Sequence, residues 1–162
     1  MRRIAIAAVL VFLCVFHLAA SEPTGNEPIP SNALLFELNY LTFSLGGNDW
    51  LVEFAIEYQR VLGDHFVLSL IPELTVGNIR NEFGALLGPI VHPFGGGLRG
   101  MFIGAHPGFA YASGSVYFIA EADVGYQWVL EHGIVVFLSI GGRHDSRIGI
   151  RRSGSFRIGF AF

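Results

Sequence analysis

The chain has 162 residues, a formal net charge of −3, 52% hydrophobic residues, 21 glycines, 15 phenylalanines and no lysine. This length allows one domain after an N-terminal targeting segment, and the modest negative charge argues against a nucleic-acid partner. The only cysteine, Cys14, lies in the first apolar run, so the rest of the chain excludes disulfides, cysteine-ligated zinc and cysteine nucleophiles.

The first segment, residues 1–21, has the pattern of a secretory signal peptide. Two arginines follow Met1, an apolar run extends over residues 4–16, and small residues precede Glu22. The run is too short to cross a bilayer as a helix, and small residues suit the cleavage positions. We expect cleavage near Ala20 or Ser21 and export of the rest. Residues 22–31 contain three prolines and predict an extended leader without structure of its own.

Residues 32–162 are divided by turn signals rich in Gly, Asn, Asp and Ser at near-regular intervals. The segments between them, predicted as strands, are 33–45, 50–62, 65–76, 83–94, 100–112, 116–131, 134–144 and 147–162. Most could cross a bilayer as tilted strands, which takes about 9–11 residues. Tight connections such as Gly63-Asp64 favour hairpins between sequential neighbours. Pro89, Pro93 and Pro107 predict bulges or breaks in the fourth and fifth strands.

Each strand has an apolar and a more polar face, because alternate residues point to opposite sides. In segment 50–62 the apolar face has Val52, Phe54, Ile56 and Tyr58, and the other has Glu53, Ala55, Glu57 and Gln59. A soluble barrel would turn the apolar face inward, and a membrane barrel would turn it outward. Three features favour the membrane barrel: aromatic residues near strand ends, glycine and alanine on the polar face, and the lack of lysine. We therefore predict an all-β, closed antiparallel up-and-down transmembrane β-barrel of about eight strands.

The C-terminus carries a resemblance to a known family. Residues 155–162 resemble the C-terminal signature of bacterial outer-membrane barrels, an alternating apolar strand with a terminal phenylalanine; the apolar positions are Phe156, Ile158, Phe160 and Phe162. Residues 120–128, followed by a glycine turn and another strand, are similar to small outer-membrane β-barrel proteins of the OmpX/OmpW type. The resemblance implies an outer-membrane location, contact with outer-membrane lipids and recognition of the last strand by the barrel-assembly machinery. The short loops depart from many such barrels and argue against adhesion through large surface loops.

The inward parity carries nine ionisable residues that we expect to form a lumen charge network: Glu37, Glu53, Glu57, Glu73, Glu121, Asp123, Arg143, Arg151 and Arg157. Opposite charges in a narrow lumen should pair, because an isolated buried charge is very costly. Two interpretations follow. The network either satisfies the interior of a structural barrel, or gates the passage of small solutes or cations, since carboxylates outnumber arginines.

The sequence also allows other hypotheses. His92 and His106 could face inward, but no metal-ligand spacing supports a metal site. The turn His144-Asp145-Ser146 suggests a lipid A-modifying, deacylase-like enzyme, yet no carboxylate follows Ser146 and Asp145 should point away from its neighbours. A soluble periplasmic barrel that binds an apolar ligand is a third possibility. We expect no catalysis, no cofactor and no metal, and the sequence leaves the oligomeric state open.

Overall fold

The computed structural model describes residues 30–42, 50–78, 81–94 and 96–162. The predicted signal peptide, residues 1–21, and all but the last two residues of the predicted leader lie outside this part. The strands are β1 (Asn32–Thr42), β2 (Trp50–Gly63), β3 (Phe66–Gly77), β4 (Glu82–Val91), β5 (Gly100–Ala112), β6 (Ser115–Val129), β7 (Ile134–Asp145) and β8 (Gly149–Ala161). A single 3-10 turn, η1 (Glu131–Gly133), joins β6 to β7. Within the described residues, no helix is long and apolar enough to span a membrane.

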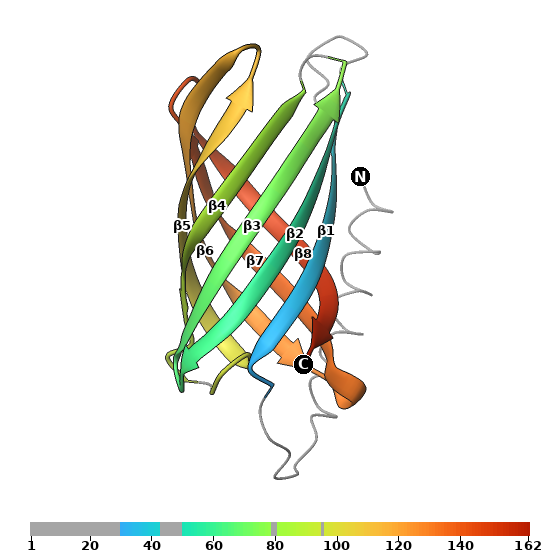
Figure 1. The fold of residues 1–162 in the computed structure, drawn as a ribbon, viewed down its shortest axis with the longest axis vertical. Coiled ribbons are helices and arrows are strands. Elements are labelled where there is room, and N and C mark those ends of the chain that lie inside the picture. Colours follow the sequence, from blue (N-terminus) through green and yellow to red (C-terminus); the bar gives the residue numbers. More distant parts are fainter. Residues whose placement is uncertain (1–29, 43–49, 79–80, 95) are drawn as a thin grey trace, which may run out of the picture.

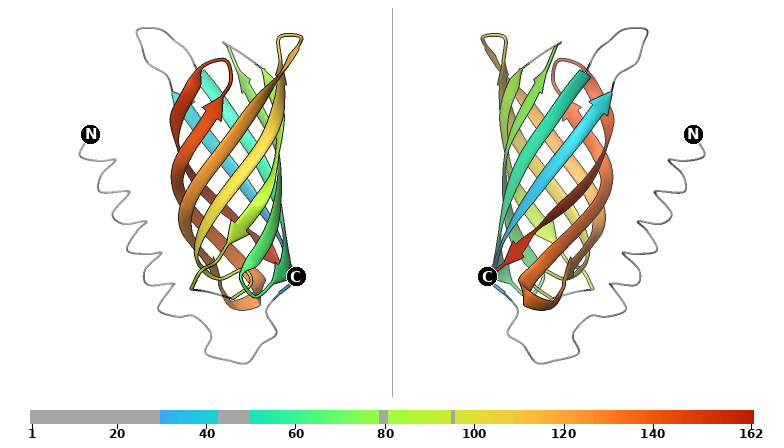
Figure 2. Two further views of the ribbon diagram at one scale, coloured as in Figure 1. Left: turned by 90° about the vertical axis from the view of Figure 1, so that its left-hand side faces the viewer. Right: turned by 90° about the vertical axis from the view of Figure 1, so that its right-hand side faces the viewer.

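The strands form one closed barrel in the order β1 to β8, and every neighbouring pair is antiparallel. Figures 1 and 2 show the strands tilted relative to the long axis of the barrel. Closure comes from β8 pairing with β1, from Ala33 opposite Ala161 to Glu37 opposite Arg157. Asn32 and Phe162 extend this seam with two backbone hydrogen bonds of 3.0 and 2.9 Å. The predicted fold class is confirmed.

The predicted strand boundaries agree within a few residues, with two informative differences. The predicted strand 83–94 ends at Val91. The amide of His92 still donates to the carbonyl of His65, at 2.9 Å, as the next position of the β3–β4 register, but the following residue is Pro93, which has no amide hydrogen to continue the ladder. The last strand begins at Gly149 rather than at residue 147. The amide of Ile148 donates to the carbonyl of Asp145, the last residue of β7, and Gly149 has a φ of 86°, which favours glycine. Residues 43–45 of the first predicted strand lie outside the described residues.

The prolines interrupt hydrogen bonding without ending the strands. The β4–β5 ladder is continuous up to Leu86 opposite Gly108 and resumes at Ile90 opposite Gly104. The gap contains Pro89 and Pro107, which have no amide hydrogen to donate. The predicted local break is therefore confirmed between these strands, although both strands continue through it. Pro93 follows the end of β4 and lies in a bend.

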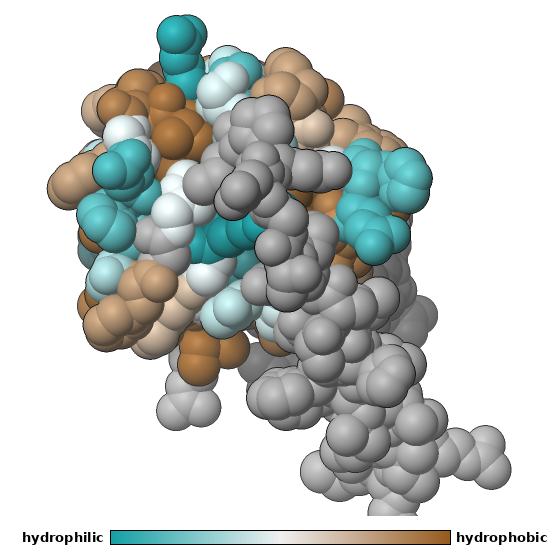
Figure 3. Space-filling model, turned by 90° about the horizontal axis from the view of Figure 1, so that it is seen from below, coloured by the Kyte–Doolittle hydropathy of each residue, from teal (hydrophilic) through white to brown (hydrophobic). Residues whose placement is uncertain are grey.

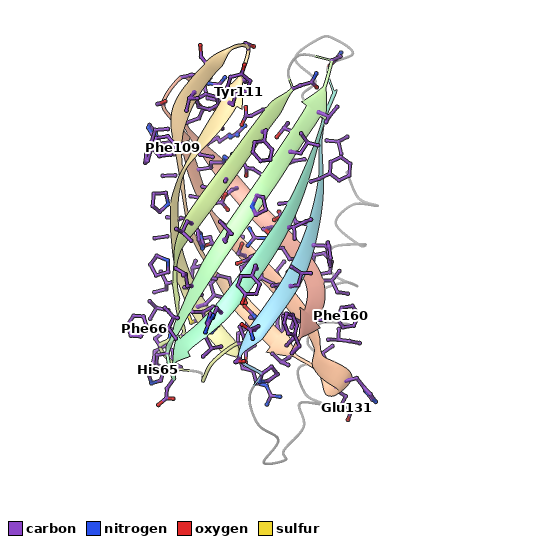
Figure 4. The ribbon with its side chains drawn as sticks, in the orientation of Figure 1. His65, Phe66, Phe109, Tyr111, Glu131 and Phe160 are labelled. Atoms are coloured by element: carbon purple, nitrogen blue, oxygen red, sulfur yellow. The ribbon has the colours of Figure 1, made fainter. Side chains whose placement is uncertain are left out.

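The outer surface of the barrel wall is apolar. Phe54, Ile56, Leu70, Val124 and Ile158 are exposed on it, and their strand neighbours on the other parity point inward. Phe66, Phe109 and Phe160 project outward from the wall in Figure 4. In the view along the barrel from below, hydrophobic side chains lie around the perimeter (Figure 3). The sequence prediction that the apolar parity faces outward is thus confirmed for the described strands.

Several inward positions must be glycine because neighbouring strands approach closely. A Cβ atom at Gly159 would lie 1.8 Å from the carbonyl oxygen of Leu34, and one at Gly125 would lie 2.1 Å from that of Leu138. These distances are far below van der Waals contact, so no side chain fits there. Gly159 belongs to the seam between β8 and β1, and a larger residue there would prevent the barrel from closing.

Candidate functional site

The first cluster of the lumen charge network is centred on Arg157 in β8. Its Nε donates to Glu37 Oε2 at 2.5 Å, and its Nη1 donates to Glu57 Oε2 at 2.6 Å. Glu37 faces Arg157 directly in the strand register, and Glu57 comes from the next strand, β2. The side chain also lies over the ring of Phe137, with Cζ 4.6 Å from the ring centroid. Arg157 is 3% exposed, so its charge is balanced by the two buried carboxylates and not by solvent.

A chain of hydrogen bonds continues from Glu57 across the barrel. Its Oε1 accepts from Ser69 Oγ at 2.6 Å and from Gln59 Nε2 at 2.9 Å. Gln59 Oε1 in turn accepts from Gln127 Nε2 at 2.8 Å. The chain thus links β8, β2, β3 and β6, and Gln59, Ser69 and Gln127 are all buried. Sequence reasoning placed Gln59 on the polar face of its strand, but it included none of these three residues in the network.

The second cluster of the network crosses the lumen from Arg143 in β7 to Glu73 in β3. Nη1 of Arg143 donates to Glu73 Oε2 at 2.7 Å, and Nη2 donates to Glu73 Oε1, so the pair is bidentate. Glu121 Oε2 lies 3.8 Å from Nη1 and Glu82 Oε1 lies 3.9 Å from Nη2, both beyond a direct hydrogen bond. Arg143 therefore forms hydrogen bonds with Glu73, whereas it interacts with Glu121 only through the attraction of opposite charges.

A third cluster closes one end of the barrel around Arg147, in the β7–β8 turn. Its Nη2 lies 3.1 Å from Glu82 Oε2 and 3.0 Å from Asp145 Oδ2. The guanidinium stacks on Tyr117, with Cζ 3.3 Å from the ring centroid. Hydrogen bonding to Asp145 raises the pKa of the Arg147 guanidinium, which keeps the cation charged. Sequence reasoning missed Glu82, because it lies one residue before the predicted start of its strand.

The remaining predicted residues do not all enter ion pairs. Asp123 Oδ1 lies 3.8 Å from Nδ1 of His106, and both side chains are buried. Glu53 is half-buried and has no ion pair within 4.0 Å among the described residues. Arg151 is half-buried and faces the lumen. The structure therefore brings the nine predicted residues inside but divides them into separate clusters.

A cavity of about 250 Å³ lies between the Arg157 and Arg143 clusters. Its wall is formed by Glu37, Glu53, Ala55, Ile71, Glu73, Leu86, Glu121, Arg143, Arg151, Ser153, Gly154, Ser155 and Arg157. Glu53, Arg151 and Ser153 are half-buried, whereas Glu37, Ser155 and Arg157 are buried. The cavity is therefore deepest beside Arg157 and approaches solvent where β8 begins.

An apolar plug fills the lumen at the end where the described chain begins and ends. It consists of Ala33, Leu35, Val67, Ile90, Leu98, Phe102, Val129, Val135 and Phe137, all 0–2% exposed. The rings of Phe102 and Phe137 stack with centroids 4.4 Å apart. Sequence reasoning missed this plug, because its strand residues share the inward parity with the charged residues and meet only when the barrel closes.

Two other predicted features have a definite geometry. His92 and His106 both face inward, at 0% and 1% exposure, and burial lowers the pKa of His92, which lies beyond the end of β4. They do not converge on a metal-type site, and no group of three or more His, Cys, Asp or Glu side chains in the described part of the chain is arranged to hold a metal ion. In the His144-Asp145-Ser146 turn, Asp145 is buried and bound to Arg147, whereas His144 is exposed on the outer wall near Phe118. The three side chains are therefore not arranged as a catalytic triad.

No family model matches the sequence, and no curated protein matches it. Among solved structures, the chain is similar to the outer membrane protein Ail of Yersinia pestis in a phospholipid bilayer nanodisc. The TM-score is 0.51 and the sequence identity 9%, and the match covers 82% of this chain and 99% of the Ail chain. At this identity the likeness concerns the fold. The chain has the fold of a small, eight-stranded outer-membrane β-barrel.

Proposed function

We propose that this protein is an integral outer-membrane β-barrel with a structural role, held in the bilayer by its apolar outer wall. The observation that carries the proposal is the orientation of the two strand faces. Large apolar side chains cover the outside and ionisable ones lie inside. In water this arrangement would be unstable, because each large apolar side chain left exposed forgoes about 1.5–3 kcal/mol of burial energy. In lipid the same side chains are solvated by acyl chains.

The proposed barrel does not conduct solutes. The apolar plug supports this reading, because Leu35, Phe102 and Phe137 are completely buried within the lumen. Above the plug, the Arg157 cluster adds a second barrier of paired charges. An eight-stranded barrel is in any case just wide enough for side chains to fill its interior. We therefore favour the structural interpretation of the charge network over gated passage.

Phe156, Ile158, Phe160 and Phe162 are part of the same proposal. All four side chains are exposed on the outer wall, at 47–66%. This exposure would leave them accessible to the barrel-assembly machinery before the wall meets lipid. Substituting Phe162 by serine is then expected to lower the amount of folded barrel in the outer membrane, whereas refolding of the purified variant into detergent should be nearly unchanged.

Cell fractionation combined with gel mobility tests the proposal as a whole. A closed lipid barrel stays compact in cold SDS and unfolds on boiling, so we expect a heat-modifiable band in the outer-membrane fraction. In planar bilayers we expect no conductance steps from the wild-type protein. Recovery in the periplasmic fraction without detergent would contradict the membrane location. Reproducible conductance steps that shift in Glu121→Gln would contradict the closed lumen and support gated passage.

A further inference from the structure

We propose that the lumen cavity is a binding site for a small organic cation, of the class of short alkyl diamines. The charges that line the cavity point to a cation. Glu37, Glu53, Glu73 and Glu121 contribute carboxylates, and Arg143, Arg151 and Arg157 contribute guanidinium groups. Arg157 is in addition shared with Glu57, which does not line the cavity. The carboxylates thus exceed the guanidinium groups, and unpaired buried charge is strongly unfavourable.

The ion pairs leave two particular carboxylates under-satisfied. Arg143 directs both terminal nitrogens to Glu73, so Glu121 remains 3.8 Å away without a hydrogen bond to it. Glu53 has no ion pair within 4.0 Å among the described residues. Glu53 belongs to β2 and Glu121 to β6, which are opposite one another in the closed order of eight strands. Two acceptor groups therefore face the cavity from opposite walls.

A second, independent observation comes from Ser155. Its side chain lines the same cavity and is 5% exposed, and its hydroxyl has no hydrogen-bond partner among the described residues. A buried hydroxyl of this kind normally finds a partner. An ammonium group in the cavity would donate to it, as well as to the neighbouring carboxylates.

The size and the remaining lining of the cavity narrow the class of ligand. Water takes up about 30 Å³ per molecule in the liquid, so the cavity of about 250 Å³ has room for about eight water molecules or for one short amine. Ala55, Ile71 and Leu86 form an apolar strip on β2, β3 and β4, on the path from Glu53 toward the wall that carries Glu121. Such a strip suits the methylene groups of an alkyl chain between two ammonium ends. A metal ion fits less well, because the described carboxylates are not gathered into a three-ligand group.

Binding of 1,4-diaminobutane to the refolded, purified barrel in detergent micelles tests the inference by isothermal titration calorimetry at about 0.15 M salt. We expect saturable binding that weakens at least about tenfold in Glu53→Gln and in Glu121→Gln, because each variant loses a charge-assisted hydrogen bond. Glu131→Gln is the matched control, since Glu131 is exposed at the η1 turn, and it should bind like the wild type. n-Butylamine should bind more weakly than the diamine, and sodium succinate should not bind.

Three results would overturn the inference: no saturable binding of the diamine, equal binding by both glutamine variants and the wild type, or calcium chloride displacing the diamine at equal concentration. If a glutamine variant lacks the heat-modifiable band, Ser155→Ala replaces it. That variant removes only a hydroxyl and should weaken binding several-fold, and unchanged binding would count against the site. The test is separate from the proposed membrane location, because a periplasmic barrel with the same lumen would still bind the diamine.

Discussion

Replacing Arg157 by methionine should destabilise the barrel more than any other single change in the charge network. Methionine keeps an apolar stem against Phe137 but removes the partner of both Glu37 and Glu57. Removing one partner of a buried ion pair typically costs about 3–5 kcal/mol, because a charge is left uncompensated. Arg157 has two carboxylate partners, but Glu57 retains its hydrogen bonds from Ser69 and Gln59. We therefore expect a loss of unfolding free energy inside this range and not twice as large.

Equilibrium unfolding in urea, followed by tryptophan fluorescence and by the cold-SDS gel shift, measures this loss. Arg60→Met is the matched control, because Arg60 is an exposed arginine on strand β2. This substitution should change the unfolding free energy by less than about 0.5 kcal/mol. The triple variant Arg157→Met, Glu37→Gln, Glu57→Gln should regain most of the stability, since no buried charge is then unpaired. A loss below about 1 kcal/mol in Arg157→Met, or no recovery in the triple variant, would refute the reasoning.

Further predictions test the wall, the seam, the buried His92 and the turn. Ile56→Arg, in the middle of β2 on the outer face, should cost about 2–4 kcal/mol in lipid vesicles and nearly nothing if the wall faced water. Gly159→Ala should block closure of the seam and abolish the compact band in cold SDS; a normal band would contradict the close approach to Leu34. Burial lowers the pKa of His92 in the folded chain. As the pH falls through about 6.5, His92 therefore binds a proton in the unfolded chain but not in the folded one. The free energy of unfolding should thus decline from pH 7 to pH 5. His92→Leu should flatten that decline in urea titrations at several pH values, and an unchanged slope would argue against His92 as its source. Ser146→Ala should leave both stability and lipid A acylation unchanged. If the wild-type protein alters lipid A acylation and the variant does not, that difference would support the enzyme hypothesis.

The plug and the ion pairs show what the sequence could not specify. Leu35 and Phe102 occupy the same inward parity as the charged residues, so alternation alone marks them as interior without saying that they lie at one level. Likewise, Glu73 and Arg143 are 70 residues apart and meet only across the lumen. Which carboxylate meets which arginine depends on the strand register and on closure of the barrel, and neither is contained in a local pattern.

By itself, the sequence determined the strands, their meander order and the orientation of their faces. These features are local, because they depend on a period of two residues and on turn residues at the ends of segments. The tertiary structure decided the pairing of Arg157 with Glu37 and Glu57, the packing of the plug and the existence of the cavity. All three depend on closure, because side chains from β2, β6 and β8 become neighbours only when the last strand pairs with the first.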